Sequence, residues 1–263
     1  MGPYKILFLD IDGTVLRPDH TIEETTRVAI KEMKKQNMEV VLATGRPLHE
    51  LSDLAEELQI TSFIGYNGAL GIYEGDIIFA EPMKPEDVSY ILNVSSAYGH
   101  EVVCYTNSKN YFTSLEPEAV QAFQKQFHLR QNDLLTEDVM EEVLGMTIIT
   151  AGNNGDSLYQ INGGIHLSQV NVEGMQHCFD VIRDHVNKGI GVKFLLNKLG
   201  IKSEESIAFG DGMNDKEMLS YVGEGFAMGN AHPDLFPHAK HKTTSVTNSG
   251  IYNGLKSLGL IES

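Results

Sequence analysis

The chain has 263 residues and carries 36 acidic against 20 basic side chains, which gives a formal charge of −16. This negative charge disfavours nucleic acid and anionic membrane surfaces as partners and favours a small molecule or a metal ion, although solubility alone explains such a surplus of carboxylates more simply. With 41% hydrophobic residues and only two cysteines, Cys104 and Cys178, outside any metal-site spacing, the composition predicts a globular protein that needs neither disulfides nor zinc.

No apolar stretch approaches the roughly 18 residues that a membrane-spanning helix needs. The N-terminal apolar stretch is short, Asp10 ends it, and no basic region precedes it, so a secretory leader is not indicated. We therefore expect a cytoplasmic protein that binds neither membranes nor nucleic acid and is a monomer or a weak homo-oligomer.

The first third of the chain alternates between strand and helix patterns. A β-rich apolar run over 4–9 ends at Asp10, and a capping box of Thr21 and Glu24 predicts the start of a helix. After a second predicted strand over 39–43, Pro47 suits the first turn of another helix, whose apolar residues recur at helical spacing. A third short strand is predicted over 62–65.

The middle of the chain, from about residue 83 to about residue 185, has a different pattern. A helix is predicted over 85–98 and short strands over 101–105 and 146–151, and the run Gly152-Asn153-Asn154-Gly155 is typical of a hairpin turn. This mixture indicates an antiparallel sheet with helices, which is an α+β arrangement. We interpret it as a second domain inserted into the first.

Strand and helix patterns alternate again near the C-terminus. A helix that Gly200 closes is followed by a strand over 206–209, a turn at Gly210-Asp211-Gly212, and a further helix and strand. Repeated strand–helix–strand units predict an α/β fold in which helices wrap a parallel sheet.

Two carboxylates, Asp10 and Asp12, follow the first predicted strand directly. Open α/β sheets place their ligands at the carboxyl ends of strands, and the turn at Gly13 lets both side chains border one crevice. One carboxylate oxygen can ligate Mg²⁺ while another attacks phosphorus, so the pair suits a hard cation and a phosphoryl group. A simple turn would explain Asp12 and Gly13 but would leave Asp10 without a role.

A second acidic segment, Gly210-Asp211-Gly212-Met213-Asn214-Asp215, follows another predicted buried strand. Its carboxylates would face the first pair, and clustered carboxylates destabilise one another unless a cation holds them together. Asn214 or Asp215 could simply cap the following helix, but capping leaves Asp211 without a role. The segment therefore predicts a magnesium site.

Two further positions could bind an anion. Thr44 and Gly45 lie between a strand end and a helix start, where a hydroxyl and backbone N–H groups are available, although many threonines there only cap a helix. Lys188 precedes a helix and could supply the positive charge that a phosphate requires. By sequence alone Lys193 is a close competitor.

These segments, in this order, resemble the motifs of the haloacid dehalogenase superfamily of phosphatases, specifically its Cof-like branch with a type IIB cap. The resemblance covers nearly the whole chain, and Val186-Asn187-Lys188-Gly189 is similar to the third motif of this branch, which favours Lys188 over Lys193. Asn67-Gly68-Ala69 is also similar to that branch. The matching residues are Asp10-Ile11-Asp12-Gly13-Thr14 for the first motif, Thr44 for the second, Lys188 for the third, and the segment from Gly210 to Asp215 for the fourth.

The resemblance implies a Rossmann-like core formed by 1–82 and 186–263, with an inserted α+β cap domain over 83–185. Asp10 would attack the phosphoryl group and form an aspartyl-phosphate, and Asp12 would protonate the leaving alcohol and then activate water. Mg²⁺ would be held by Asp10, the backbone carbonyl of Asp12 and Asp211, with Asp215 orienting a metal-bound water. The implied phosphate ligands are Thr44, Gly45, Lys188, Asn214 and the backbone N–H of Ile11.

The implied enzyme is a phosphoric monoester hydrolase that acts on small phosphorylated metabolites such as sugar phosphates. A phosphomutase would use the same aspartyl-phosphate chemistry, and a non-catalytic sugar-phosphate-binding regulator could use the same scaffold. The intact set of catalytic residues argues against the regulator. Whether Arg46 or Asn67 contacts the substrate stays open.

Overall fold

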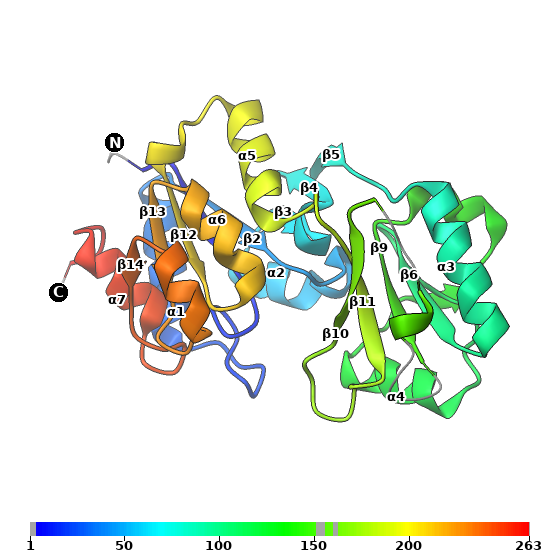
Figure 1. Ribbon diagram of the computed structural model, residues 1–263. Coiled ribbons are helices and arrows are strands. Elements are labelled where there is room, and N and C mark those ends of the chain that lie inside the picture. Colours follow the sequence, from blue (N-terminus) through cyan, green and yellow to red (C-terminus); the bar gives the residue numbers. More distant parts are fainter. Residues whose placement is uncertain (1–3, 151–155, 160–162, 263) are drawn as a thin grey trace. The chain divides into compact units, whose positions relative to one another are not determined.

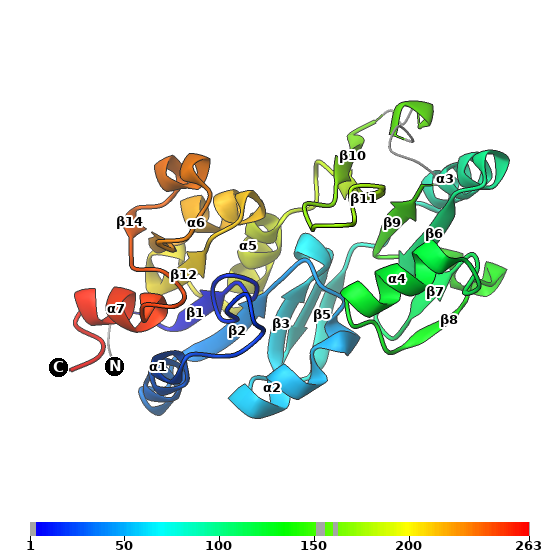
Figure 2. The same ribbon diagram turned by 90° about the horizontal axis from the view of Figure 1, so that it is seen from below.

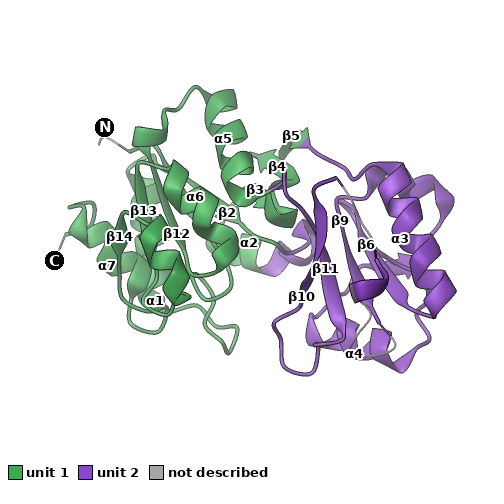
Figure 3. Ribbon diagram, viewed as in Figure 1, with its two compact units in different colours: residues 1–45, 54–79, 187–263 green, residues 46–53, 80–186 purple. Residues whose placement is uncertain are grey.

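The computed structural model describes residues 4–150, 156–159 and 163–262, so the turn predicted over 152–155 lies outside the described residues. The chain forms two compact units, which Figure 3 distinguishes by colour. Unit 1 comprises residues 1–45, 54–79 and 187–263, and unit 2 comprises residues 46–53 and 80–186.

Unit 1 contains a mostly parallel eight-stranded sheet in the order β14-β13-β12-β1-β2-β3-β4-β5 (Figure 1). The strands from β14 to β3 run parallel, and β4 pairs antiparallel with β3. Its strands are β1 Ile6–Leu9, β2 Glu39–Ala43, β3 Ser62–Gly65, β4 Leu70–Tyr73, β5 Asp76–Ala80, β12 Ser206–Gly210, β13 Glu224–Ala227 and β14 His241–Lys242. The helices around it are α1 Glu24–Lys35, α2 Ser52–Leu58, α5 Lys188–Leu199, α6 Lys216–Tyr221 and α7 Gly250–Ser257.

Helices cover both faces of this sheet. Figure 2 shows α5 and α6 on one face and α1 and α2 on the other. On the first face, Val192, Leu196 and Leu219 pack against Phe8 and Ala208 of the central strands. A sheet that is covered on both faces needs strands that are apolar throughout, which explains why β1 is an unbroken apolar run with no alternation.

Unit 2 contains a six-stranded sheet in the order β10-β11-β9-β6-β7-β8. Its neighbouring strands pair antiparallel except β7 and β8, which pair parallel. The elements are α3 Pro85–Tyr98, β6 Glu101–Tyr105, β7 Asn110–Phe112, α4 Glu118–Gln126, β8 Asn132–Leu134, β9 Gly145–Ile149, β10 Ile165–Gln169 and β11 Cys178–Arg183.

The predicted α/β fold class is confirmed, because the central sheet of unit 1 is mostly parallel and helices cover it. The predicted domain limits of 1–82 with 186–263 and 83–185 stay a prediction. One observation adds to them, because residues 46–53 group with unit 2 although they lie early in the chain. None of the helices in the described parts combines the length and apolar character that a bilayer span requires.

Two local expectations were wrong. The capping box does not form: α1 begins at Glu24 with no side-chain cap, and Thr21 instead donates from its backbone and hydroxyl to Asp19. The helix expected from Pro47 onward begins only at Ser52, after a separate 3-10 turn over Leu48–Glu50.

Candidate active site

Asp10 lies at the carboxyl end of β1, between the ends of β2 and β12. Its backbone N–H donates to the carbonyl of Phe209, which extends the pairing of β1 with β12 by one residue. The residue is only 6% exposed. A carboxylate is stable in such a place only when charged or hydrogen-bonding partners surround it.

Lys188 supplies the main partner of Asp10. It is the first residue of α5, it is fully buried, and its Nζ donates to Asp10 Oδ1 at 2.5 Å and to Asp215 Oδ1 at 2.6 Å. Lys193, the competing candidate, is exposed. The structure therefore brings Lys188, and not Lys193, to the carboxylates.

The start of α5 is fixed by a cap and by a close helix contact. The side chain of Asn187 caps the helix by accepting from the N–H of Ile190 at 3.0 Å. A Cβ on Gly189 would lie 2.6 Å from the backbone of Glu217 in α6, so only glycine allows the two helices to approach this closely. The rigid start of α5 determines where Lys188 lies.

Asp215 organises the second acidic segment. Its Oδ2 accepts from the backbone N–H groups of Asp211 and Gly212, both at 3.0 Å, while its Oδ1 accepts from Lys188. Asp215 precedes α6, but its side chain makes no cap hydrogen bond to that helix. The carboxylate holds the turn and the lysine together instead of capping α6.

The charges at this site influence one another strongly. Burial raises the pKa of Asp10 well above its usual value, and Asp215 adds to this effect while Lys188 opposes it. Burial and the charge of Asp215 also raise the pKa of Asp211 to about 6. Burial alone would lower the pKa of Lys188, but Asp10 and Asp215 more than offset this and raise it above its usual value.

The residues present fit a hard divalent cation. Asp10, Asp211 and Asp215 each offer a carboxylate oxygen, and these atoms lie within 4.8 Å of one another. One ammonium among three carboxylates leaves two negative charges, which a divalent ion would neutralise. Carboxylate oxygens are also the ligands that Mg²⁺ prefers in proteins.

Gly13 leaves room for Asp211. A Cβ on Gly13 would lie 2.2 Å from Asp211 Oδ2, and the φ of +81° is one that other residues rarely adopt. Thr14 Oγ1 donates to Asp211 Oδ1 at 3.2 Å. The first motif thus holds the carboxylate of the fourth motif from two sides.

Asn230 is a residue of this site that the sequence analysis missed. Its Nδ2 donates to the carbonyl of Gly13 at 2.8 Å and to Asp211 Oδ2 at 3.2 Å, and its Oδ1 accepts from the N–H of Val246 at 2.8 Å. A signal was present, because Asn230 closely follows β13, another parallel strand of the same sheet. Polar residues after such strands are expected near the site.

The predicted phosphate-binding residues form a neighbouring group. Thr44 is buried at the end of β2, and its carbonyl accepts from the N–H of Asn67 at 3.0 Å. A Cβ on Gly45 would lie 3.0 Å from Asn67 Oδ1, and that oxygen also accepts from Asn214 Nδ2 at 3.0 Å. Asn67 therefore connects the second motif with the fourth.

The other predicted residues differ in burial and in the unit to which they belong. Asp12 is exposed, whereas Ile11 is buried and its carbonyl accepts from the N–H groups of Val15 and Leu16. Arg46 belongs to unit 2. The roles assigned to all of these residues stay predictions.

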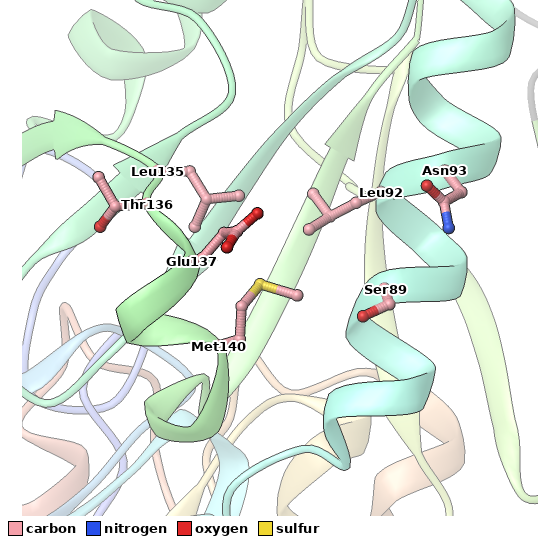
Figure 4. A pocket seen from close by; sticks show the side chains of 7 residues that line it. All are labelled: Ser89, Leu92, Asn93, Leu135, Thr136, Glu137 and Met140. Atoms are coloured by element: carbon pink, nitrogen blue, oxygen red, sulfur yellow. The ribbon is translucent and has the colours of Figure 1, made fainter.

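A separate cavity of about 480 Å³ lies in unit 2 between α3 and the 3-10 turn at 137–142 (Figure 4). Its lining includes no lysine or arginine, so none of these side chains could neutralise a phosphate. The cavity is not a candidate for the phosphate site. The lining residues are Ser89, Leu92, Asn93, Leu135, Thr136, Glu137 and Met140.

Comparison with known proteins assigns the class. A family model described as haloacid dehalogenase-like hydrolase matches residues 7–255. YkrA of Bacillus subtilis (strain 168) is 30% identical over 261 residues, covering 98% of this chain and 99% of YkrA. The HMP-PP phosphatase of Klebsiella pneumoniae (strain 342) is 30% identical over 246 residues, covering 90% of this chain and 88% of that protein. The solved structure of a subclass IIB sugar phosphatase of the superfamily is 25% identical with a TM-score of 0.82, covering 98% of this chain and 100% of that one.

The chain therefore belongs to the haloacid dehalogenase-like hydrolase family. The resemblance to its Cof-like branch with a type IIB cap is confirmed, and so is the predicted enzyme class of phosphoric monoester hydrolase.

Proposed function

We propose that this chain is a Mg²⁺-dependent phosphatase that hydrolyses small phosphorylated metabolites through an aspartyl-phosphate on Asp10. The observation that carries the proposal is the buried carboxylate of Asp10. It accepts a hydrogen bond from Lys188, and carboxylate oxygens of Asp10, Asp211 and Asp215 lie within 4.8 Å of one another. A carboxylate that is fixed in this way at a strand end is oriented for attack before the substrate arrives.

In the first half of the reaction, a carboxylate oxygen of Asp10 attacks phosphorus and the bond from phosphorus to the leaving oxygen breaks. Asp12 donates its proton to that oxygen and releases the alcohol. In the second half, the Asp12 carboxylate takes a proton from water, the water oxygen attacks phosphorus, and phosphate leaves Asp10. General acid–base catalysis of this kind contributes about 10²- to 10⁴-fold.

The remaining residues bind charge and hold geometry. Lys188 would neutralise part of the phosphate charge, and Thr44, Gly45, Asn214 and the N–H of Ile11 would donate to its oxygens. Asp10, the carbonyl of Asp12 and Asp211 would hold Mg²⁺, and Asp215 would orient a metal-bound water. When bound, the cation would supply charge neutralisation at the phosphoryl group.

Two relatives support a small phosphorylated substrate without defining it. One is named for HMP-PP and the other is a sugar phosphatase, so proteins of this fold act on chemically different phosphate esters. We infer a small phosphorylated metabolite for this chain as well.

The test is release of inorganic phosphate from a panel of phosphate esters, with Mg²⁺ and with EDTA. We expect hydrolysis that EDTA abolishes and Mg²⁺ restores, and no turnover in Asp10→Asn. Asp76→Asn, an exposed carboxylate of the same unit, is the matched control and should behave like the parent. Near-normal hydrolysis by Asp10→Asn would overturn the assignment.

The same assay distinguishes the phosphomutase alternative. A mutase returns the phosphoryl group to another oxygen of its substrate, so it converts one ester into an isomer and releases little inorganic phosphate. Stoichiometric release of phosphate and alcohol supports the phosphatase.

A further inference from the structure

The segment 46–53 leaves unit 1 directly after Gly45 and returns to it at Leu54. Its regular structure is limited to a 3-10 turn over Leu48–Glu50 and the first two residues of α2. Such a segment needs contacts elsewhere to hold one conformation. Its side-chain contacts therefore decide how it is held.

Glu50 makes the main contacts. Its side chain is 7% exposed, and Oε1 accepts from Asn110 Nδ2 at 2.8 Å, from the N–H of Arg130 at 2.8 Å and from the N–H of Gln131 at 3.2 Å. Asn110 is itself fully buried, and its Nδ2 also donates to Asn132. One carboxylate oxygen therefore collects three donors from β7 and the chain leading into β8.

Two other residues of the segment, His49 and Asp53, also contact the rest of unit 2, and these contacts differ in strength. His49 Nε2 lies 3.0 Å from Asn110 Oδ1, which adds a second buried contact with the same residue. The ion pair of Asp53 with Arg130 is 2.8 Å long but exposed on both sides, and exposed pairs contribute little. Hydrogen bonds to a buried charge are much stronger, so Glu50 dominates the anchoring.

We propose that Glu50 is a positioning residue that fixes segment 46–53 to the rest of unit 2 and thereby fixes Arg46, the residue that directly follows Thr44 and Gly45. The inference rests on the proposed function, because Thr44 and Gly45 are the proposed phosphate ligands. Arg46 lies four residues before Glu50 in the same anchored segment. The 45–46 junction is therefore where the chain passes directly from the proposed phosphate ligands into the anchored segment.

The first test is hydrogen exchange measured by mass spectrometry on four proteins: parent, Glu50→Ala, Glu50→Asp and Asp53→Asn. In Glu50→Ala we expect the protection of peptides over 46–53 to fall by roughly 10- to 100-fold, the equivalent of one or two hydrogen bonds to a charged acceptor. The protection of peptides from strand β1 should be the same as in the parent. Glu50→Asp keeps the charge on a shorter side chain and should lie between parent and Glu50→Ala, and it provides the test if Glu50→Ala does not fold. Asp53→Asn is the control, because it removes only the exposed ion pair with Arg130, and its exchange should match that of the parent.

The second test is the steady-state hydrolysis of p-nitrophenyl phosphate. Glu50→Ala should raise KM about tenfold and leave kcat within about twofold, because a lost positioning contact weakens binding of substrate and transition state alike. A merely structural loss would lower the amount of active enzyme without changing KM. Glu50→Gln, which can still accept with its carbonyl oxygen, should restore most of the parent KM.

A double-mutant cycle with Arg46→Ala checks that Glu50 acts through the segment. If it does, Glu50→Ala should change KM little when Arg46 is already replaced by alanine. If instead the KM of the double variant changes by the product of the two single changes, the two residues act independently and the positioning role of Glu50 is overturned. Unchanged exchange in Glu50→Ala beside normal hydrolysis by the parent would overturn this inference alone. Absence of Mg²⁺-dependent hydrolysis in the parent would overturn the proposed function, and the positioning role with it.

Discussion

Replacing Lys188 by Met removes the only ammonium that contacts Asp10 and Asp215 in the described part of the chain, while keeping a side chain of similar length. Both carboxylates then remain buried without their cation. The variant isolates the electrostatic role of Lys188, since little volume is lost. We expect it to fold but to be strongly destabilised at neutral pH.

The size of the effect follows from the geometry. Carboxylate oxygens of Asp10 and Asp215 up to 4.8 Å apart repel by about 3 to 4 kcal/mol at an effective dielectric constant of about 20. Removing one partner of a buried ion pair costs about 3 to 5 kcal/mol. The two arguments agree, so we expect the free energy of unfolding of unit 1 to fall by about 3 to 5 kcal/mol near neutral pH.

The loss of stability in Lys188→Met should depend on pH and on Mg²⁺. The pKa of Asp10 is already raised, and without Lys188 it rises further above the unfolded value of about 3.9. A raised folded pKa gives stability that is present below the unfolded pKa and is lost as pH rises through the folded one, so the variant should suffer less at about pH 5 than at about pH 8. Mg²⁺ at about 100 times its dissociation constant would restore about 2.7 kcal/mol.

The free energy of unfolding of unit 1 can be measured by urea titration with hydrogen exchange as the readout. Peptides of β1 and β12 report on unit 1, and peptides of β6 and β9, which belong to unit 2, are the internal control. The unit 2 peptides should show the parent midpoint. A destabilisation of unit 1 that is equal at both pH values and insensitive to Mg²⁺ would refute the electrostatic reasoning. Lys193→Met, at an exposed position of the same helix, is the matched variant and should unfold like the parent.

Three further outcomes are expected. Gly13→Ala places a Cβ 2.2 Å from Asp211 Oδ2 at a φ of +81°, so we expect the free energy of unfolding measured with urea to fall by about 1 to 3 kcal/mol, and the enzyme to require more Mg²⁺. Asn230→Ala removes a donor to Asp211, and calorimetric titration should show Mg²⁺ affinity reduced about 10- to 100-fold. An affinity equal to that of the parent would show that Asn230 does not orient Asp211 for Mg²⁺. Burial lowers the pKa of His100, so the stability present above the unfolded value of about 6.5 should be lost as pH falls through the folded pKa. Exchange of the α3 peptides should show this loss, and His100→Gln should reduce it.

The regular parts of the core could be predicted from sequence because their signals are local. The strands over 39–43 and 62–65 were predicted with their observed limits, and Gly200 ends α5 with a φ of +65° as expected. Apolar run length and a terminating glycine depend only on nearby residues. The same holds for Asp10 and Asp211, each of which follows a buried strand.

The errors arose where a distant or competing partner prevailed. Thr21 matched a capping box, but Asp19, two residues away, took both of its donors. The helix expected from Pro47 is interrupted because Glu50 bonds to residues 60 to 81 positions further along the chain. No periodicity in the sequence can reveal such a partner.

The contacts of Asp215 differ from those that the sequence predicted for it. From sequence it was either a helix cap or a carboxylate near the metal. In the structure its two oxygens accept from Lys188 and from the N–H groups of Asp211 and Gly212. These three donors stabilise its buried charge, and each of them belongs to a segment that the proposed chemistry needs in place. The site is therefore preorganised by a residue that need not touch the substrate, and preorganised charge is what lowers a phosphoryl-transfer barrier without reorganisation during the reaction.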